Sequence, residues 1–266
     1  MNIKVSKIIL YFLLLFLLLP LLVLLIWSIS NSWTWPNIFP NNFGLRGYKY
    51  IFSFRTGTLE VLLNSIVLSS VVTFITIAIS IPASKALGVY EFRFKKIFKI
   101  LVLAPIIVPP VAVAMGIHVS FIKLGLANTF LGVVLVHLIP CMPYGIRIIT
   151  SIFEGLGEKM ELQAKVLGAN SIQTFFHITL PIITPGVISA ASMVFIVSFS
   201  QYFLTFLIGG GKVKTLSLVM FPYIKSGDRM MASAYSVVFS ITTLGVLLLM
   251  ESAIKKKYKN KTDLFV

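Results

Sequence analysis

The sequence predicts an all-α polytopic membrane protein with six transmembrane helices, and two observations carry that prediction. Hydrophobic residues make up 58% of the 266 residues, and charged residues make up only 12%. A chain of this length cannot bury so much apolar side chain in a water-soluble core, so its solvent is lipid. The second observation is six long apolar segments, which are expected to span the membrane within one domain over residues 1–266. They lie at about residues 8–29, 61–82, 100–122, 129–149, 183–207 and 233–254.

The first segment, residues 8–29, contains eighteen Leu, Ile, Phe or Val residues. Together these favour membrane insertion by about 5 to 10 kcal/mol, which outweighs the defect expected from Pro20. The segment is too long for the apolar core of a signal peptide and lacks a small-residue cleavage site. We therefore expect an uncleaved first span.

Lysine and arginine residues lie between the apolar segments and predict the orientation of the chain. Fifteen of the 23 Lys and Arg residues lie in the N-terminus, loop 83–99, the loop after the fourth segment and the C-terminal tail. The loops on the opposite side carry eight. Because the side richer in Lys and Arg faces the cytoplasm, both termini are expected there. The net charge of +15 is thus a topology signal, and we expect no nucleic-acid partner.

Proline residues are expected to interrupt three of the segments. An interior proline costs about 3 kcal/mol in a water-exposed helix, and in lipid the freed carbonyl needs another partner. A kink in a packed bundle explains each cluster as well as a translocation pathway does, but three clusters together favour a pathway. The clusters are Pro105, Pro109 and Pro110 in the third segment, Pro140 and Pro143 in the fourth, and Pro181 and Pro185 at the start of the fifth.

Ionisable residues are nearly absent from the apolar segments. His118 and His137 are nineteen residues apart, on different helices, and have no metal-ligand spacing. Each is expected to be a hydrogen-bonded interior histidine, and the single cysteine, Cys141, has no partner. Since no loop is longer than about thirty residues, there is no room for a soluble catalytic domain. We therefore expect no catalytic residue, no metal and no cofactor. Proton- or sodium-driven carriers usually keep carboxylates at membrane depth, and none is found here.

A few polar residues remain as candidates for a substrate pathway. Each alone is more often an interhelical hydrogen-bond donor than a substrate ligand. The densest run is residues 198–202, near the outer half of the fifth segment. The pathway residues that we name are Asn64, Pro109, Pro110, Ser198, Ser200, Gln201 and Tyr202.

The polar loop at about residues 154–182 has a helix pattern of its own, and the charge count places it in the cytoplasm. One helix is expected over residues 158–167, ending at Gly168. Asn170 or Ser171 can cap a second short helix before the fifth segment begins. The apolar face of that second helix consists of Ile172, Phe175, Phe176 and Thr179.

Five residues of this loop have a distinctive spacing: Ala164, Gly168, Ile178, Leu180 and Pro181. The spacing resembles the EAA loop of type I ABC importer permeases, whose pattern is E-A-A, three residues, G, nine residues and I-x-L-P. Leu162 and Gln163 replace the first two letters, and Glu161 supplies the acid one position early. The segments 44–48 and 64–65 are also similar to the outer entry segment of these permeases, and the number of spans agrees.

The resemblance implies a permease subunit of an ATP-driven importer, which takes a small polar solute from an extracytoplasmic substrate-binding protein. It implies that the two loop helices insert into a groove of a cytoplasmic ABC ATPase dimer. A second permease subunit is also implied, for which we favour a hetero-pair over a homodimer. The alternative for the loop is an amphipathic segment lying on the lipid headgroups. The ATPase-coupling residues that follow from the resemblance are Glu161, Leu162, Ala164, Gly168, Phe175, Phe176, Ile178, Leu180 and Pro181.

The stretch from Phe199 to Gly211 and the compact layout are most similar to the spermidine/putrescine-type permeases. A polyamine is therefore the favoured solute, with a phosphonate or iron(III) as alternatives. Two other functions stay open for the sequence alone: an ion-coupled secondary carrier and a non-transporting membrane scaffold. Each of these readings places the protein in the inner or plasma membrane as a multi-pass protein.

Overall fold

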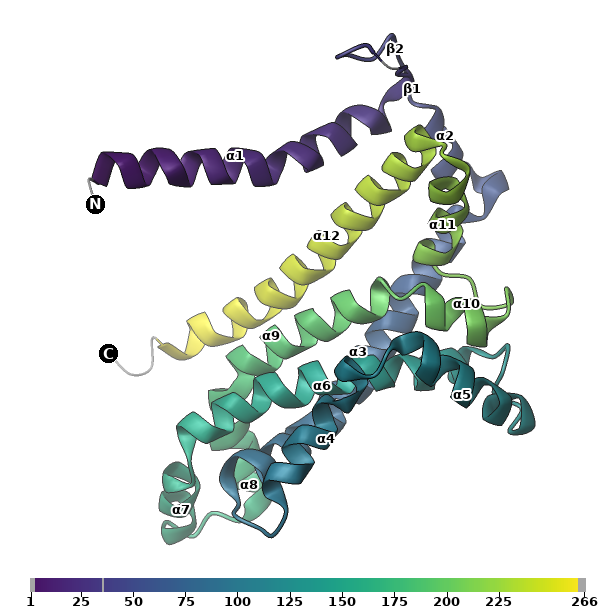
Figure 1. Cartoon of the computed structure of the whole chain (residues 1–266). Helices are drawn as coiled ribbons and strands as arrows, with labels where there is room; N and C mark the ends of the chain where they lie inside the picture. The colour runs from purple at the N-terminus through teal and green to yellow at the C-terminus, as the bar shows by residue number, and fades with distance from the viewer. Residues whose placement is uncertain (1–2, 35, 263–266) are drawn as a thin grey trace. The chain divides into compact units, whose positions relative to one another are not determined.

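A computed structural model describes residues 3–34 and 36–262, which are mostly helical (Figure 1). The chain divides into two compact units. The first comprises the chain up to residue 63 together with residues 216–244, and the second comprises residues 64–215 together with the chain from residue 245 onward. The assignment of residues 1–266 to one transmembrane domain stays a prediction.

Within residues 3–34 and 36–262, five helices are long and apolar enough to cross a membrane. A sixth span is obtained if α4 (Lys95–Ile107) and α5 (Pro110–Lys123) are counted together, since they form one apolar pair bent by 93°. The predicted number of six spans is therefore confirmed, with one of them broken. The five long helices are α1 (Ile3–Ser28), α3 (Thr58–Val89), α6 (Phe130–Leu156), α9 (Leu180–Phe199, with the turns before it) and α12 (Arg229–Thr262).

The first unit contains an ordered segment after α1 where the sequence predicts only a loop. Strands β1 (Ser30–Ser32) and β2 (Asn42–Phe43) pair antiparallel and are the one departure from an all-α fold among the described residues. The segment continues through α2 (Arg46–Ile51) and the 3-10 turn η1 (Phe54–Thr56). The unit also contains α11 (Leu216–Ser226).

Tyr235 of α12 is the centre of the first unit. Its side chain is fully buried, its ring stacks on Tyr223 of α11 with 5.3 Å between centroids, and its hydroxyl lies 3.2 Å from Thr58 Oγ1. Arg46 of α2 donates to Asp228 at 2.7 Å. These contacts join the start of α3 to α11 and the beginning of α12.

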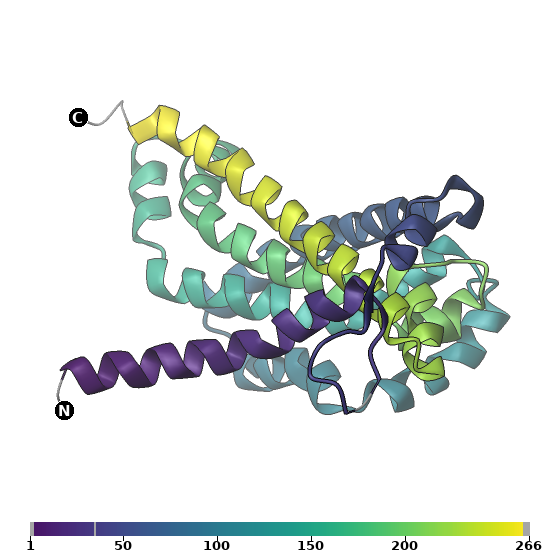
Figure 2. The same ribbon diagram turned by 90° about the horizontal axis from the view of Figure 1, so that it is seen from above.

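The second unit is built around α6, which packs against α4, α5, α9 and α10 (Phe203–Gly209) (Figures 1 and 2). Ser84 of α3 donates to the Ile146 carbonyl of α6 at 2.8 Å, so α3 lies beside it as well. Apolar residues of α3, α6, α9 and α10 fill the space between these helices. The fully or nearly buried members of this core include Leu68, Val72, Val133, Val134, Val136, Val194, Leu204 and Ile208.

Only one of the three proline clusters interrupts a helix. At the break between α4 and α5, Val108 is extended, with φ −77° and ψ 130°, as expected for a residue before proline. Pro109 then caps α5. The prediction is wrong for the fourth segment, because Pro140 and Pro143 lie inside a continuous α6. Neighbouring helices cover this part of α6, which is the condition under which a membrane helix tolerates proline.

The fifth predicted segment, 183–207, is wrong in its second half. Helix α9 ends at Phe199, and the chain resumes as α10 at Phe203. No proline lies at this break. Ser200 is the C-cap of α9, and its Oγ donates to the Val197 carbonyl at 3.2 Å.

The close contact of α3 with α6 predicts a sharp difference between two glycines of α6. A Cβ atom at Gly145 would lie 2.5 Å from Ser80 Oγ and 3.0 Å from Thr76 Cγ2, whereas one at Gly155 meets no atom within 4 Å. Gly145→Val is therefore expected to destabilise the protein by about 1–3 kcal/mol through overpacking. The thermal unfolding midpoint in detergent measures this, with Gly155→Val as the control. Equal shifts for the two variants would contradict the packing of α6 on α3.

Candidate functional site

The structure contains the first predicted loop helix, the corner after it and the start of the second loop helix. Helix α7 (Lys159–Val166) lies within the expected range of 158–167. Gly168 follows with φ +85°, a left-handed conformation that ends helices and favours glycine. Asn170 then caps α8 (Ser171–Thr174). Its Oδ1 accepts from the Gln173 backbone N–H at 2.8 Å, and Gln173 Oε1 accepts from the Asn170 N–H at 3.0 Å, which is a reciprocal capping box.

The second loop helix is not a separate helix. It continues through a π-helical turn, η2 (Phe175–Thr179), directly into α9. Pro181 causes no corner: the helix is continuous through it, and the Leu180 N–H just before it donates to the Phe175 carbonyl five residues earlier, as in a π-helix. Residues 171–199 thus form one apolar helix of 29 residues, and the loop is attached to the membrane span without a flexible joint.

The carboxylate of Glu161 is the point where three parts of the second unit meet. Its Oε2 accepts from Lys85 Nζ of α3 at 2.6 Å, and its Oε1 accepts from Thr179 Oγ1 of η2 at 2.7 Å. The side chains of Lys85 and Glu161 are 25% and 17% exposed, so the pair is largely removed from water. Glu161 therefore fastens α7 to the end of α3 and to the start of the fifth span.

The pKa of the Glu161 carboxyl is lowered from its usual 4.5. Partial burial by itself raises this pKa, but the hydrogen bonds from Lys85 and Thr179 and the charges of Lys85 and Lys165 outweigh burial. The carboxylate is thus ionised at neutral pH and acts as a double acceptor.

The remaining coupling residues divide into exposed and buried ones. Ala164 is buried on the inner side of α7, and Phe175, Ile178 and Leu180 are half-buried. Leu162 is 51% exposed. The loop thus presents a set of large apolar side chains outward, which we call the loop apolar face. Its members are Met160, Leu162, Val166, Leu167, Ile172 and Phe176.

The residues named for a substrate pathway do not form one cluster. Asn64 donates to the Lys214 carbonyl at 2.7 Å, and Pro109 is an exposed helix cap. The side chain of Pro110 lies outside the described residues. Four others, Ser198, Ser200, Gln201 and Tyr202, lie together at the break between α9 and α10. The pathway assignment stays a prediction for all seven.

A buried histidine spans the break between α9 and α10. His137 of α6 is fully buried, and its two ring nitrogens lie 3.1 Å from Ser198 Oγ and 2.9 Å from Thr205 Oγ1. The expectation of a hydrogen-bonded interior histidine is confirmed for His137, whereas His118 is only half-buried. The sequence did not predict its partners, nor Lys85 and Thr179 as partners of Glu161, because all four pairs are far apart in the chain and have no spacing that marks them.

A family comparison agrees with this arrangement of spans and loop. The model of the family described as binding-protein-dependent transport system inner membrane component matches residues 80–255, which contain both the loop and the break. The chain belongs to this family. It is therefore an inner-membrane, multi-pass permease subunit of an ABC importer.

Individual relatives agree with the family while differing in the solute that they are named for. The permease is 28% identical to a spermidine/putrescine transport system permease protein PotC homolog of Mycoplasma genitalium, over 91% of this chain and 88% of that one. It is 26% identical to the molybdate/tungstate transport system permease protein WtpB of Pyrococcus abyssi, over 74% and 79%. A bacterial ABC transporter structure involved in import of the polysaccharide alginate has the same fold, with TM-score 0.67 at 16% identity over 95% and 94%.

The double hydrogen bond at Glu161 predicts that Glu161→Gln loosens the loop. The neutral amide loses the ionic contact with Lys85. We expect the free energy of local opening of the loop to fall by about 1 kcal/mol, so that its amides exchange roughly fivefold faster. Hydrogen–deuterium exchange over residues 159–179 of the permease in nanodiscs measures this. The matched control is Glu158→Gln, since Glu158 is exposed and caps α7 without a side-chain hydrogen bond.

The effect of Glu161→Gln on amide exchange should depend on pH. Because the folded-state pKa of Glu161 lies below 4.5, its contribution is complete above that pH and disappears as the pH falls through the folded-state pKa. The difference between wild type and Glu161→Gln should therefore persist from pH 7 to about pH 5 and shrink in more acid buffer. A difference that grows on acidification would contradict the ionised double acceptor.

Proposed function

We propose that this permease forms half of the translocation pathway for a small polar solute and that an ABC ATPase dimer docks on the loop at residues 154–182. The observation that carries the proposal is the loop apolar face, held by a loop that Glu161 fastens to α3 and η2. Val166 and Leu167 are each 87% exposed, and Ile172 is 71% exposed. Exposed apolar side chains of this size on an ordered element are typical of a protein interface.

The attachment of the loop supports a coupling role. Glu161 holds α7 against α3 and η2, so the loop can move only together with the helices that it contacts. The continuous helix from residue 171 to residue 199 gives a docked ATPase a direct connection to the fifth span. In this family ATP hydrolysis belongs to a separate subunit. Movement of that subunit reaches the spans only if the loop on which it docks does not deform.

The competing role for the loop apolar face is contact with lipid headgroups. An amphipathic segment of this kind binds membranes through the same side chains. The two roles differ in their dependence on the corner at Gly168, because lipid accepts many loop shapes whereas a protein groove accepts one.

The solute that we favour is a polyamine such as spermidine or putrescine. Support comes from relatives named as spermidine/putrescine permeases in Mycoplasma genitalium, Mycoplasma pneumoniae and Haemophilus influenzae. Other relatives are named for molybdate/tungstate and for trehalose/maltose, and a phosphonate or iron(III) is a further alternative. We also propose a second, different permease subunit, with a homodimer as the alternative, and an extracytoplasmic substrate-binding protein. A related alginate transporter is described in complex with a periplasmic protein.

The docking proposal predicts different results for two substitutions of Gly168. Valine tolerates a φ of +85° poorly, whereas asparagine adopts left-handed conformations readily, and no atom lies within 4 Å of a Cβ at this position. Gly168→Val should therefore reduce co-purification of the ATPase about tenfold or more, and Gly168→Asn should retain it. Both variants should insert into the membrane normally. Co-purification of the ATPase with Gly168→Val at the wild-type level would reject the docking site and favour the headgroup role.

The solute assignment is tested by uptake into liposomes that contain the permease with its ATPase, second permease and binding protein. We expect ATP-dependent uptake of labelled spermidine that excess putrescine inhibits and that molybdate and maltose do not. Uptake of molybdate or maltose in preference would overturn the polyamine assignment while leaving the importer intact. Absence of every ATP-dependent uptake in a correctly assembled complex would count against the importer itself.

A further inference from the structure

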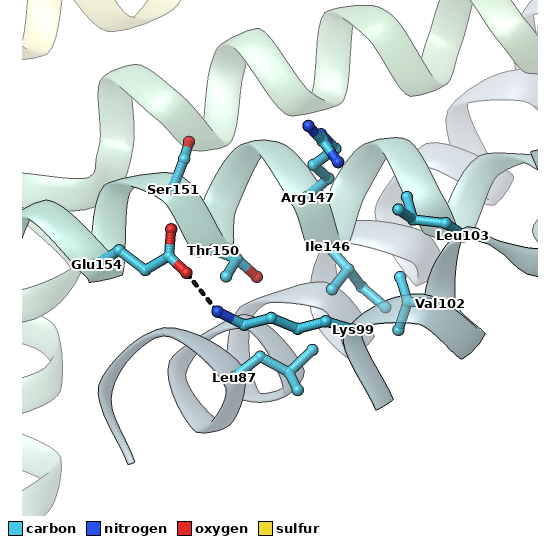
Figure 3. Close-up of a pocket in the computed structure, with 9 residues that line it drawn as sticks. All are labelled: Leu87, Lys99, Val102, Leu103, Ile146, Arg147, Thr150, Ser151 and Glu154. Carbon is cyan, nitrogen blue, oxygen red and sulfur yellow. Dashed lines mark hydrogen bonds and ion pairs between the residues drawn. The ribbon is translucent and has the colours of Figure 1, made fainter. Parts of the chain in front are cut away.

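A cavity of about 230 Å³ lies between α3, α4 and α6, close to the end of α6 that leads into the coupling loop (Figure 3). Its walls are apolar on the side of α3 and α4, apart from Lys99 of α4, and mainly polar along α6, apart from Ile146. Helix α4 covers it loosely, since no residue of α4 is buried. The residues that line it are Leu87, Lys99, Val102, Leu103, Ile146, Arg147, Thr150, Ser151 and Glu154.

One hydroxyl in this cavity lacks a partner. Thr150 is 8% exposed, and its Oγ1 makes no hydrogen bond. Other helical threonines, such as Thr73, Thr184 and Thr243, donate to the carbonyl four residues earlier. Figure 3 shows the Thr150 side chain on the same side of α6 as Lys99. A buried hydroxyl without a partner is unfavourable, so this group is available to a ligand.

A cation lies next to this hydroxyl at the rim of the cavity. Lys99 Nζ donates to Glu154 Oε1 at 2.5 Å, and the two side chains are 38% and 46% exposed. An ammonium group has three donors, so Lys99 can bind a second acceptor without releasing Glu154. Arg147 is exposed and points to the opposite side of α6.

The surroundings of the cavity are positively charged. The stretch 83–99 contains five Lys or Arg residues and a single acid, Glu91. Among the lining residues, Arg147 and Glu154 add one charge of each sign. The ligand should therefore be anionic, and it should also be amphiphilic, because the inner walls are formed by Leu87, Val102, Leu103 and Ile146 and the outer face of α4 exposes Leu101 and Ile97.

We propose that the cavity binds an anionic phospholipid from the leaflet next to the coupling loop. A phosphate oxygen accepts from Thr150 Oγ1 and from Lys99 Nζ, and an acyl chain lies along the apolar wall between α4 and α6. Basic pockets between transmembrane helices recognise anionic lipid headgroups in this way. The lipid would fill the space under α4 and so hold the first half of the broken span against α6.

The test is native mass spectrometry of the full-length permease released from nanodiscs of defined composition. We expect retention of phosphatidylglycerol in preference to phosphatidylcholine. Thr150→Val keeps the shape of the side chain and removes the hydroxyl, and Lys99→Gln removes the cation. Each should reduce retained phosphatidylglycerol about tenfold, the effect of losing a hydrogen bond to a charged group.

Controls separate this site from general attraction to a basic protein. Lys96→Gln removes an exposed charge of the same helix that does not line the cavity, and it should leave retention unchanged. Added inorganic phosphate should not displace the lipid; displacement would identify a free-phosphate site and reject the lipid. Equal retention of the two lipids, or wild-type retention by a monodisperse Thr150→Val variant, would also overturn the proposal.

Discussion

The loop at residues 154–182 depends on one largely buried charge. A helix of eight residues such as α7 is not stable on its own in water, so its position must come from tertiary contacts. Glu161 supplies that contact because its carboxylate binds two donors from different elements. A partly buried charge that lost these partners would be costly, which makes the observed position of α7 the favourable one. The exposed side chains of the loop apolar face keep fixed places as a consequence.

The helices that follow the break after α4 and the break after α9 pack on each other in the second unit. Helix α10, which follows the break after α9, packs on α5, which follows the break after α4, and also on α6. The backbone N–H of Asn128 donates to the Ile208 carbonyl of α10 at 2.7 Å. Interrupted helices at membrane depth require that protein cover the freed polar groups. Helices α5 and α10 are thus covered by each other and by α6, and His137 provides a polar contact to both sides of the break after α9.

The sequence predicted those features that are set by neighbouring residues. Gly168 and Asn170 were assigned correctly because a left-handed stop and a helix cap are decided within a few residues. The number of spans followed from apolar length. Helix breaks at proline could not be predicted in this way. Pro109 and Pro140 both lie in apolar segments, yet only Pro109 lies at a helix break. The difference depends on which helices pack around each proline. The break at residues 200–202 contains no proline at all. The partners of Glu161 and His137 were likewise out of reach, since Lys85 precedes Glu161 by 76 residues and Ser198 follows His137 by 61.

These features together limit how energy can enter the spans. The apolar segments contain no carboxylate that an ion gradient could titrate at membrane depth, and in this family ATP hydrolysis belongs to a separate subunit. The helix that begins at the cap Asn170 runs without a joint to Phe199, and a π-helical turn inside it binds Glu161 through Thr179. A continuous helix of this kind would carry a movement of the loop to its far end. That end is the break at residues 200–202, where Ser198 is held by His137 and the regular backbone bonds stop. We infer that movement of the loop changes the backbone conformation at this break, at the end of the fifth span. The polar run of residues 198–202 lies at the same place.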